Sequence, residues 1–158
     1  MIRVFISHKR EDSEDAVAVA SVLKRHGVST YIDVLDPHLS HAGDDLGDYF
    51  RVILSRCSHL MAVVSENTKL SWWVPFEIGI ATEKQYPIAT YAIGACSLPS
   101  YLKKWPYLRS LSDLTTYVKV ASGTKRHILA EGIEKIAASR RAVYSREFHK
   151  QLKAELGQ

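Results

Sequence analysis

The chain has 158 residues, of which 46% are apolar, 24% charged and 9% aromatic. This length predicts one domain and excludes two of ordinary size. The apolar fraction is that of a folded protein rather than a disordered chain or a coiled coil. No apolar run approaches the ~20 residues that a membrane span needs. Residues 1–7 read as a strand and not as a signal peptide, so we expect a cytoplasmic protein.

The net charge of +4 would suit an acidic partner, but the surplus of basic residues gathers near the end of the chain, over residues 140–158. We expect a solvated basic tail there and no nucleic-acid partner. Cys57 and Cys96 lack the close spacing of a zinc site or a redox pair, which predicts two half-buried thiols in a reducing cytosol. The seven histidines are scattered, and we expect no metal site.

The first segments of the chain alternate between strand and helix patterns. Residues 4–7 (VFIS) are a short β-branched and aromatic run, which predicts a buried strand. Asp12 or Ser13 is expected to cap a helix, because apolar residues then recur at helical spacing, and Gly27 is expected to end it. Residues 29–33 (STYID) predict the second strand.

A polar loop over residues 36–43 leads to the second helix. We expect that helix to begin near Asp44, where carboxylates favour the helix N-terminus. Residues 59–65 (HLMAVVS) are the most hydrophobic stretch of the chain and predict the third strand. The next helix is expected to begin near Ser71, with Pro75 in its first turn, where a missing amide hydrogen is tolerated.

Two further strand patterns follow. Residues 87–93 (PIATYAI) predict the fourth strand and residues 114–120 (LTTYVKV) the fifth, while the segment between them has no clear pattern. A final helical region is expected after Gly123. We therefore expect one domain over residues 1–140. Residues 141–158 are expected to form a basic helical extension that packs on the domain or continues it.

This alternation predicts an α/β fold. Near-continuous apolar strands separated by helices form a parallel sheet that is covered on both faces. With right-handed crossovers, five strands most often take the doubly wound, flavodoxin-like order 2-1-3-4-5. Such sheets bind ligands at the carboxyl ends of the strands, where the strand order reverses. Here the order reverses between the first and third strands, and the residues that follow Ser7, Asp33 and Ser65 are expected to line that point.

Three common classes of nucleotide or phosphate site are excluded at this edge. A P-loop needs a glycine-rich run that ends in Lys and Ser or Thr, and none is present. A dinucleotide fingerprint needs closely spaced glycines after the first strand, where this chain has SHKRED. A phospho-acceptor receiver domain needs an Asp at the end of the third strand, where this chain has Ser65.

The segment SWWVPFE, residues 71–77, is the most informative motif. Trp73 and Glu77 are four residues apart, so a helix places them on one face. Taken alone, the pattern also fits an exposed glutamate on the first turns of a helix, with the tryptophan packed beneath it.

Other segments of the chain help to interpret the Trp73 and Glu77 spacing. VFISHK, STYID, LMAVVS and SWWVPFE occur in this order and at suitable distances, and together they resemble a Toll/interleukin-receptor (TIR) domain over residues 2–95. In this family the first strand reads (V/I)FIS(Y/H), the second ends in aromatic-Ile/Val-Asp, and catalytic members carry Trp-x-x-x-Glu. The compact chain looks like the bacterial single-domain proteins, including those of the Thoeris anti-phage systems.

The resemblance implies an enzyme that cleaves the bond between nicotinamide and ribose in NAD⁺, with Glu77 as its catalytic carboxylate. NAD⁺ would be a substrate, with no other cofactor. The loop at 36–43 corresponds to the family's BB loop, which serves assembly and gating. The resemblance and the positions at strand ends predict the residues that bind the substrate: Ser7, His8, Lys9, Tyr31, Asp33 and Trp73.

Several outcomes stay open at this stage. The product is ADP-ribose or a cyclic ADP-ribose signal, which a separate effector protein would detect. Self-association through TIR surfaces is expected in either case, with no membrane partner. Two other functions fit the pattern: a non-catalytic TIR interaction module, and an enzyme like the nucleoside deoxyribosyltransferases, which share the sheet type and a nucleophilic glutamate.

Overall fold

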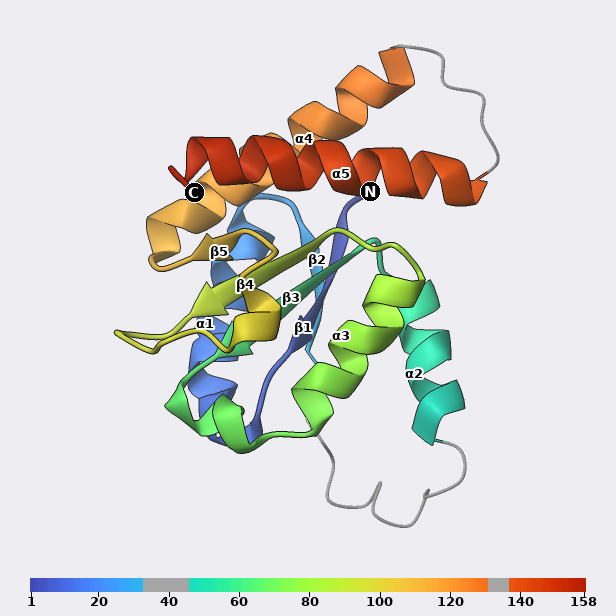
Figure 1. Cartoon of the computed structure of the whole chain (residues 1–158). Coiled ribbons are helices and arrows are strands. Elements are labelled where there is room, and N and C mark those ends of the chain that lie inside the picture. The colour runs from blue at the N-terminus through green and yellow to red at the C-terminus, as the bar shows by residue number, and fades with distance from the viewer. Residues whose placement is uncertain (33–45, 131–136) are drawn as a thin grey trace.

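A computed structural model of the chain describes residues 1–32, 46–130 and 137–158 (Figure 1). Its centre is a five-stranded parallel sheet in the order β2-β1-β3-β4-β5. The strands are β1 (Arg3–Ser7), β2 (Ser29–Ile32), β3 (His59–Val64), β4 (Ile88–Ala92) and β5 (Tyr107–Leu108). The predicted flavodoxin-like, doubly wound fold is therefore confirmed.

Helices cover both faces of the sheet. They are α1 (Ser13–Arg25), α2 (Leu46–Ser55), α3 (Trp73–Glu83), α4 (Leu111–Ala130) and α5 (Ala137–Glu155), with short 3-10 helices η1 (Arg10–Asp12), η3 (Glu66–Leu70) and η4 (Ser100–Leu102). Side chains alternate between the two faces of each strand. Val4 and Ile6 of β1 pack with α1, α4 and α5, whereas Phe5 packs with α2 and α3.

The fifth strand lies earlier in the chain than predicted. Residues 114–120 were expected to be that strand, and this prediction is wrong because they belong to α4. Gly123, expected to precede the last helical region, also lies inside α4. The true β5, Tyr107–Leu108, pairs with β4 through Tyr107 beside Thr90. Two residues are too few to give a strand pattern in the sequence.

Local hydrogen bonds and burial explain why this segment is helical. The Asp113 carboxylate accepts hydrogen bonds from the backbone N–H groups of Arg109 (2.8 Å) and Ser110 (3.1 Å), just before α4 begins. Leu114, Tyr117 and Ala121 are all completely buried, at the three- and four-residue spacing of a helix face. Tertiary packing thus overrides the β propensity of the threonine, tyrosine and valine residues.

The C-terminal helix is integrated into the core. Phe148 and Leu152 of α5 are completely buried and join the cluster on the face covered by α1 and α4. The division of the chain at residue 140 stays a prediction. Cys57 and Cys96 are buried rather than half-buried. Within the described ranges, no helix combines the length and apolar character needed to cross a bilayer.

Three expectations lie outside the described residues. They concern Asp33, the polar loop over 36–43 and the start of the second helix near Asp44. The described part of that helix, α2, begins at Leu46.

Candidate functional site

Glu77 and Ser7 meet at the carboxyl edge of the sheet. Ser7 is the last residue of β1 and Glu77 lies on the second turn of α3. The Ser7 hydroxyl donates a hydrogen bond to Oε2 of Glu77. Both side chains are completely buried, so the reading of Glu77 as an exposed surface residue is wrong.

Trp73 lies one turn before Glu77 and also faces inward. Its side chain is buried, and its ring makes an edge contact with Phe50 of α2, with 4.5 Å between the centroids. The four-residue spacing therefore places both side chains on the inner face of α3, as the helix geometry predicts. Pro75, in the first turn of α3, is compatible with this start because no intrahelical donor is needed there.

An aromatic cluster connects Trp73 to the sheet. Phe50 contacts Phe5 of β1 at a centroid distance of 6.1 Å, and Phe5 stacks on Tyr31 of β2 at 5.8 Å. The hydroxyl group of Tyr31 lies 3.1 Å from that of Tyr49 on α2. Tyr31 is thus half-buried in a packed cluster that also contains Trp73, a relationship that sequence spacing does not reveal.

His8 follows Ser7 and is also buried. Its Nε2 lies 3.3 Å from the hydroxyl group of Ser13. Burial lowers the pKa of His8 below its ordinary value, although a backbone hydrogen bond with Ile6 and the charge of Asp12 oppose this. The imidazole is therefore neutral at pH 7 and can accept or donate a hydrogen bond without carrying charge.

The other predicted site residues make no direct contact with Ser7 or Glu77 that the structure records. The ammonium group of Lys9 forms an ion pair with Glu11 at 3.2 Å, on the partly exposed start of η1. Asp33 falls outside the described residues. The structure thus joins Ser7 directly to Glu77, and joins Trp73 to Tyr31 through the aromatic cluster, whereas His8 and Lys9 contact Ser13 and Glu11.

Asp12 occupies the N-cap position of α1, as predicted, but its buried carboxylate makes no capping hydrogen bond and ties two loops together. Asp12 accepts hydrogen bonds from the hydroxyl groups of Ser65 (2.7 Å) and Thr68 (3.1 Å). Ser65 and Thr68 also form a capping box at η3, in which Thr68 accepts from the Ser65 N–H and Ser65 accepts from the Asn67 N–H. The sequence signal for this arrangement is the Ser-x-x-Thr spacing directly after the third strand.

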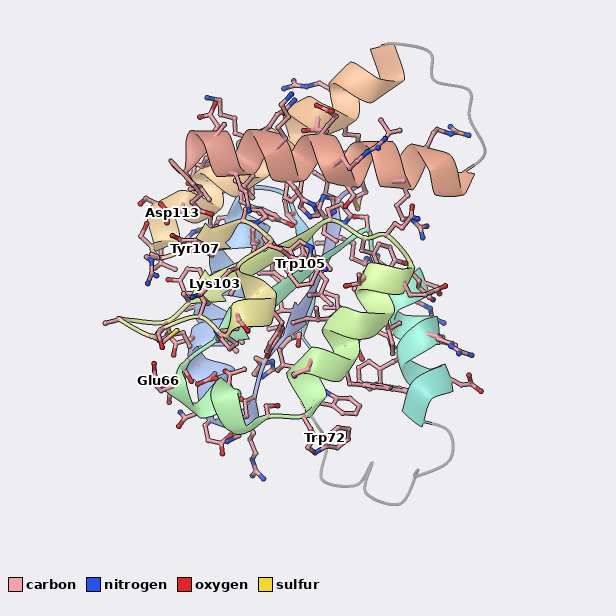
Figure 2. All side chains as sticks on the ribbon, in the orientation of Figure 1. Glu66, Trp72, Lys103, Trp105, Tyr107 and Asp113 are labelled. Carbon is pink, nitrogen blue, oxygen red and sulfur yellow. The ribbon has the colours of Figure 1, made fainter. Side chains whose placement is uncertain are left out.

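The surface near α3 contains exposed aromatic side chains. Trp72, next to the buried Trp73, is 70% exposed and projects from the start of α3 (Figure 2). Phe76, on the following turn, is 38% exposed. Exposed aromatic residues at helix surfaces are frequent in protein interfaces.

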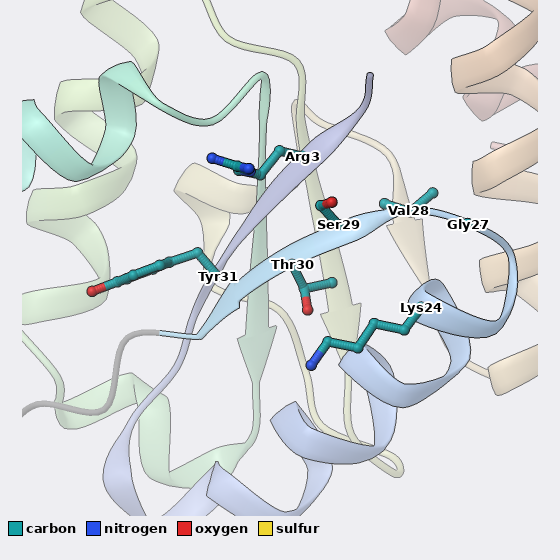
Figure 3. A pocket seen from close by; sticks show the side chains of 7 residues that line it. All are labelled: Arg3, Lys24, Gly27, Val28, Ser29, Thr30 and Tyr31. Carbon is teal, nitrogen blue, oxygen red and sulfur yellow. The ribbon is translucent and has the colours of Figure 1, made fainter.

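A separate cavity lies along the edge strand β2 (Figure 3). It has a volume of about 440 Å³, and its walls include Thr30, Tyr31 and the basic side chains of Arg3 and Lys24. Glu77 is not among the residues that line it. The cavity therefore does not belong to the edge at which Ser7 and Glu77 meet.

Comparisons with known proteins agree with this architecture. The family model of the TIR domain matches residues 4–125. Among solved structures, the chain is similar to the TIR domain of the Toll-related receptor TRR-2 from the lower metazoan Hydra magnipapillata, at 19% identity and a TM-score of 0.54. That match covers 66% of this chain and 81% of the receptor domain. No curated protein matches the chain.

Proposed function

The chain belongs to the TIR domain family, and from this premise we propose that it is a cytoplasmic enzyme that cleaves the bond between nicotinamide and ribose in NAD⁺. The family includes enzymes with this activity, and the match covers residues 4–125. The observation that carries the proposal is the Glu77 carboxylate, held by Ser7 at the carboxyl edge of the sheet. Open α/β sheets bind their ligands at this edge.

One carboxylate is enough for this reaction. A glycosidase normally needs a second carboxyl group to protonate a poor leaving group. Nicotinamide in NAD⁺ is already a pyridinium cation and leaves as a neutral molecule, so no general acid is required. What remains is to stabilise the positive charge that develops on the ribose. A carboxylate at about 4 Å supplies on the order of 4 kcal/mol at an effective dielectric constant near 20, which is roughly three powers of ten in rate.

The other residues have supporting roles in this proposal. Ser7 orients the carboxylate of Glu77, and Trp73 shields the ribosyl cation from water. His8, Lys9, Tyr31 and Asp33 are proposed to contact the rest of the dinucleotide. Exclusion of water would favour capture of the cation by a group of the same molecule, which gives a cyclic ADP-ribose signal for a separate effector, as expected for a Thoeris-type protein.

Access to the carboxylate is the main requirement that this structure sets. Glu77 and Ser7 are both completely buried, so NAD⁺ reaches them only when neighbouring segments move. TIR domains self-associate, and we propose that assembly of this chain provides that movement. Activity should then rise more steeply than in proportion to the protein concentration.

The decisive experiment is the chromatographic analysis of products from NAD⁺ at high protein concentration. The wild-type protein should release nicotinamide, and Glu77→Gln should lower the rate roughly a thousandfold. Glu83→Gln is the matched control, because Glu83 is an exposed acid on the same helix, and it should keep wild-type activity. The same chromatogram separates ADP-ribose from cyclic products, and a base-exchange assay on deoxynucleosides tests the transferase alternative.

A second candidate function is a non-catalytic TIR interaction module, which the burial of Glu77 and the exposure of Trp72 and Phe76 favour. In that case the Ser7–Glu77 hydrogen bond is purely structural, and the exposed aromatic residues contact a partner. This function predicts no nicotinamide release at any protein concentration and self-association that weakens in Trp72→Ala.

A further inference from the structure

A second cavity lies at the opposite, amino end of the sheet, beneath α4 and α5. It has a volume of about 260 Å³ and opens beside the starts of β1 and β3. Its walls contain three cationic side chains, Lys125 of α4 and Arg140 and Arg141 of α5, together with the rings of Tyr86 and Tyr144. Neither Ser7 nor Glu77 lines it, so it is separate from the edge to which NAD⁺ cleavage is assigned.

Arg141 is held in place by the protein. Its Nη1 donates a hydrogen bond to the backbone carbonyl of Lys84 at 3.3 Å, and its guanidinium group lies 4.7 Å from the centre of the Tyr86 ring. A guanidinium group has five N–H donors in a rigid plane. Because this contact uses one of them, the others remain to bind a ligand, and their orientation is already fixed.

The neutral polar groups of the cavity wall are satisfied by one another. The Tyr144 hydroxyl donates to the carbonyl of Ala121 at 3.0 Å, so it accepts from Nε2 of His59 at 2.8 Å. Nδ1 of His59 then accepts from the hydroxyl group of Ser58 at 2.9 Å. The polar groups of Ser58, His59 and Tyr144 therefore do not need a ligand to complete their hydrogen bonds. The groups available to bind one are the cationic side chains.

The electrostatic potential at the cavity is positive. No acidic side chain is among the residues that line it in the described part of the chain. Burial, together with the charges of His149 and Lys125, lowers the pKa of His59 to about 3. The three cationic side chains, with no acidic side chain beside them in the described wall, favour a bound anion.

The size of the cavity limits the class of anion. Sites for drug-sized ligands have volumes of about 300–1,000 Å³, so a cavity of about 260 Å³ holds a phosphate with one small attached group but not a dinucleotide. Arginine and lysine together bind phosphate through planar and point-charge donors. We propose that the cavity beneath α4 and α5 is a binding site for a phosphomonoester, held by Lys125 and Arg141.

Calorimetric titration of the full chain with ribose 5-phosphate at low salt tests this site. The wild-type protein should bind one molecule per chain, whereas ribose, which lacks the phosphate, should not bind. Lys125→Gln and Arg141→Gln should each weaken binding about tenfold or more. Lys150→Gln is the matched control, because Lys150 is an exposed cation of α5 that does not line the cavity, and it should bind as the wild type does.

Two further measurements complete the test. Arg141→Lys, which keeps the charge but loses the planar donors, should bind more weakly than the wild type and more tightly than Arg141→Gln, and urea denaturation of each variant shows that a loss of binding is not caused by misfolding. Vesicles that contain phosphatidic acid test a lipid headgroup as the source of the phosphomonoester. Binding to the soluble probe or to these vesicles that depends on Lys125 and Arg141 supports the site. Binding to neither, or equal binding in Lys150→Gln, Lys125→Gln and Arg141→Gln, overturns it.

Discussion

The hydroxyl group of Ser7 donates a hydrogen bond to the carboxylate of Glu77, which joins the end of β1 to the second turn of α3. The two residues lie far apart in the sequence, and both are completely buried. A buried hydroxyl–carboxylate pair is costly to break, because the remaining partner is then left without its hydrogen bond in a place that water does not reach. The pair therefore serves both the stability of this edge and the orientation of the proposed catalytic group.

Ser7→Ala should lower the free energy of unfolding by about 1–3 kcal/mol, because the Glu77 carboxylate loses a buried donor. Urea denaturation measures this change. Ser21→Ala is the matched control, since Ser21 is exposed on α1 and its hydroxyl group donates to the carbonyl of Val17, and its effect should stay within about 0.5 kcal/mol. Equal stabilities of the two variants would show that the hydrogen bond does not tie α3 to the sheet.

Asp12→Ala should also destabilise the protein, by about 2–3 kcal/mol. The substitution leaves the hydroxyl groups of Ser65 and Thr68 without their buried acceptor, and hydrogen bonds to charged groups are the strong ones. Glu14→Ala, an exposed acid in the first turn of α1, should cost less than about 0.5 kcal/mol. The difference between the urea midpoints of the two variants measures how much the hydrogen bonds of Asp12 to Ser65 and Thr68 stabilise the fold. A difference near zero would contradict the prediction.

The architecture of the sheet could be predicted from the sequence because its central strands are unusually clear. Residues 60–64 form an uninterrupted apolar run, and all side chains of β3 are buried. Burial on both faces is what removes the alternating pattern. The error at residues 114–120 has the opposite cause. There the local composition favours a strand, and the hydrogen bonds of Asp113 together with packing against α1 and α5 select the helix.

The candidate site was predictable only in part. The four-residue spacing of Trp73 and Glu77 correctly places both on one helix face. The hydrogen bond between Ser7 and Glu77 and the two hydrogen bonds that Asp12 accepts join segments that meet only after folding. The periodicity of residues along one helix or strand cannot predict such contacts, because the partners lie on different elements.

The adjacent tryptophans Trp72 and Trp73 should respond in opposite ways to the same substitution. Trp73→Ala removes a buried ring that packs on Phe50 and should cost about 3–5 kcal/mol. Trp72→Ala removes a ring that is 70% exposed and should change the free energy of unfolding by less than about 0.5 kcal/mol. Thermal and urea denaturation of both variants check this contrast, which reverses if the register of α3 differs by one residue.

Acid should destabilise the fold through its buried histidines. Burial lowers the pKa of His59 from 6.5 to about 3 and that of His149 to about 4. Below pH 6.5 the unfolded chain therefore binds protons that the folded chain does not, so the free energy of unfolding falls as the pH is lowered. Each histidine contributes a slope of up to about 1.4 kcal/mol per pH unit between its two pKa values, and this contribution is fully present above pH 6.5.

His59→Gln isolates the contribution of one of these groups. Glutamine has no titrating group in this range, so the variant should lose less stability than the wild type between pH 6.5 and pH 4, whatever its stability at neutral pH. Urea denaturation at a series of pH values measures both slopes. Because His149 remains in the variant, its slope should be reduced and not abolished. If the two curves run parallel, His59 takes up its proton equally well in the folded and unfolded chains, and the buried, neutral imidazole between Ser58 and Tyr144 is ruled out.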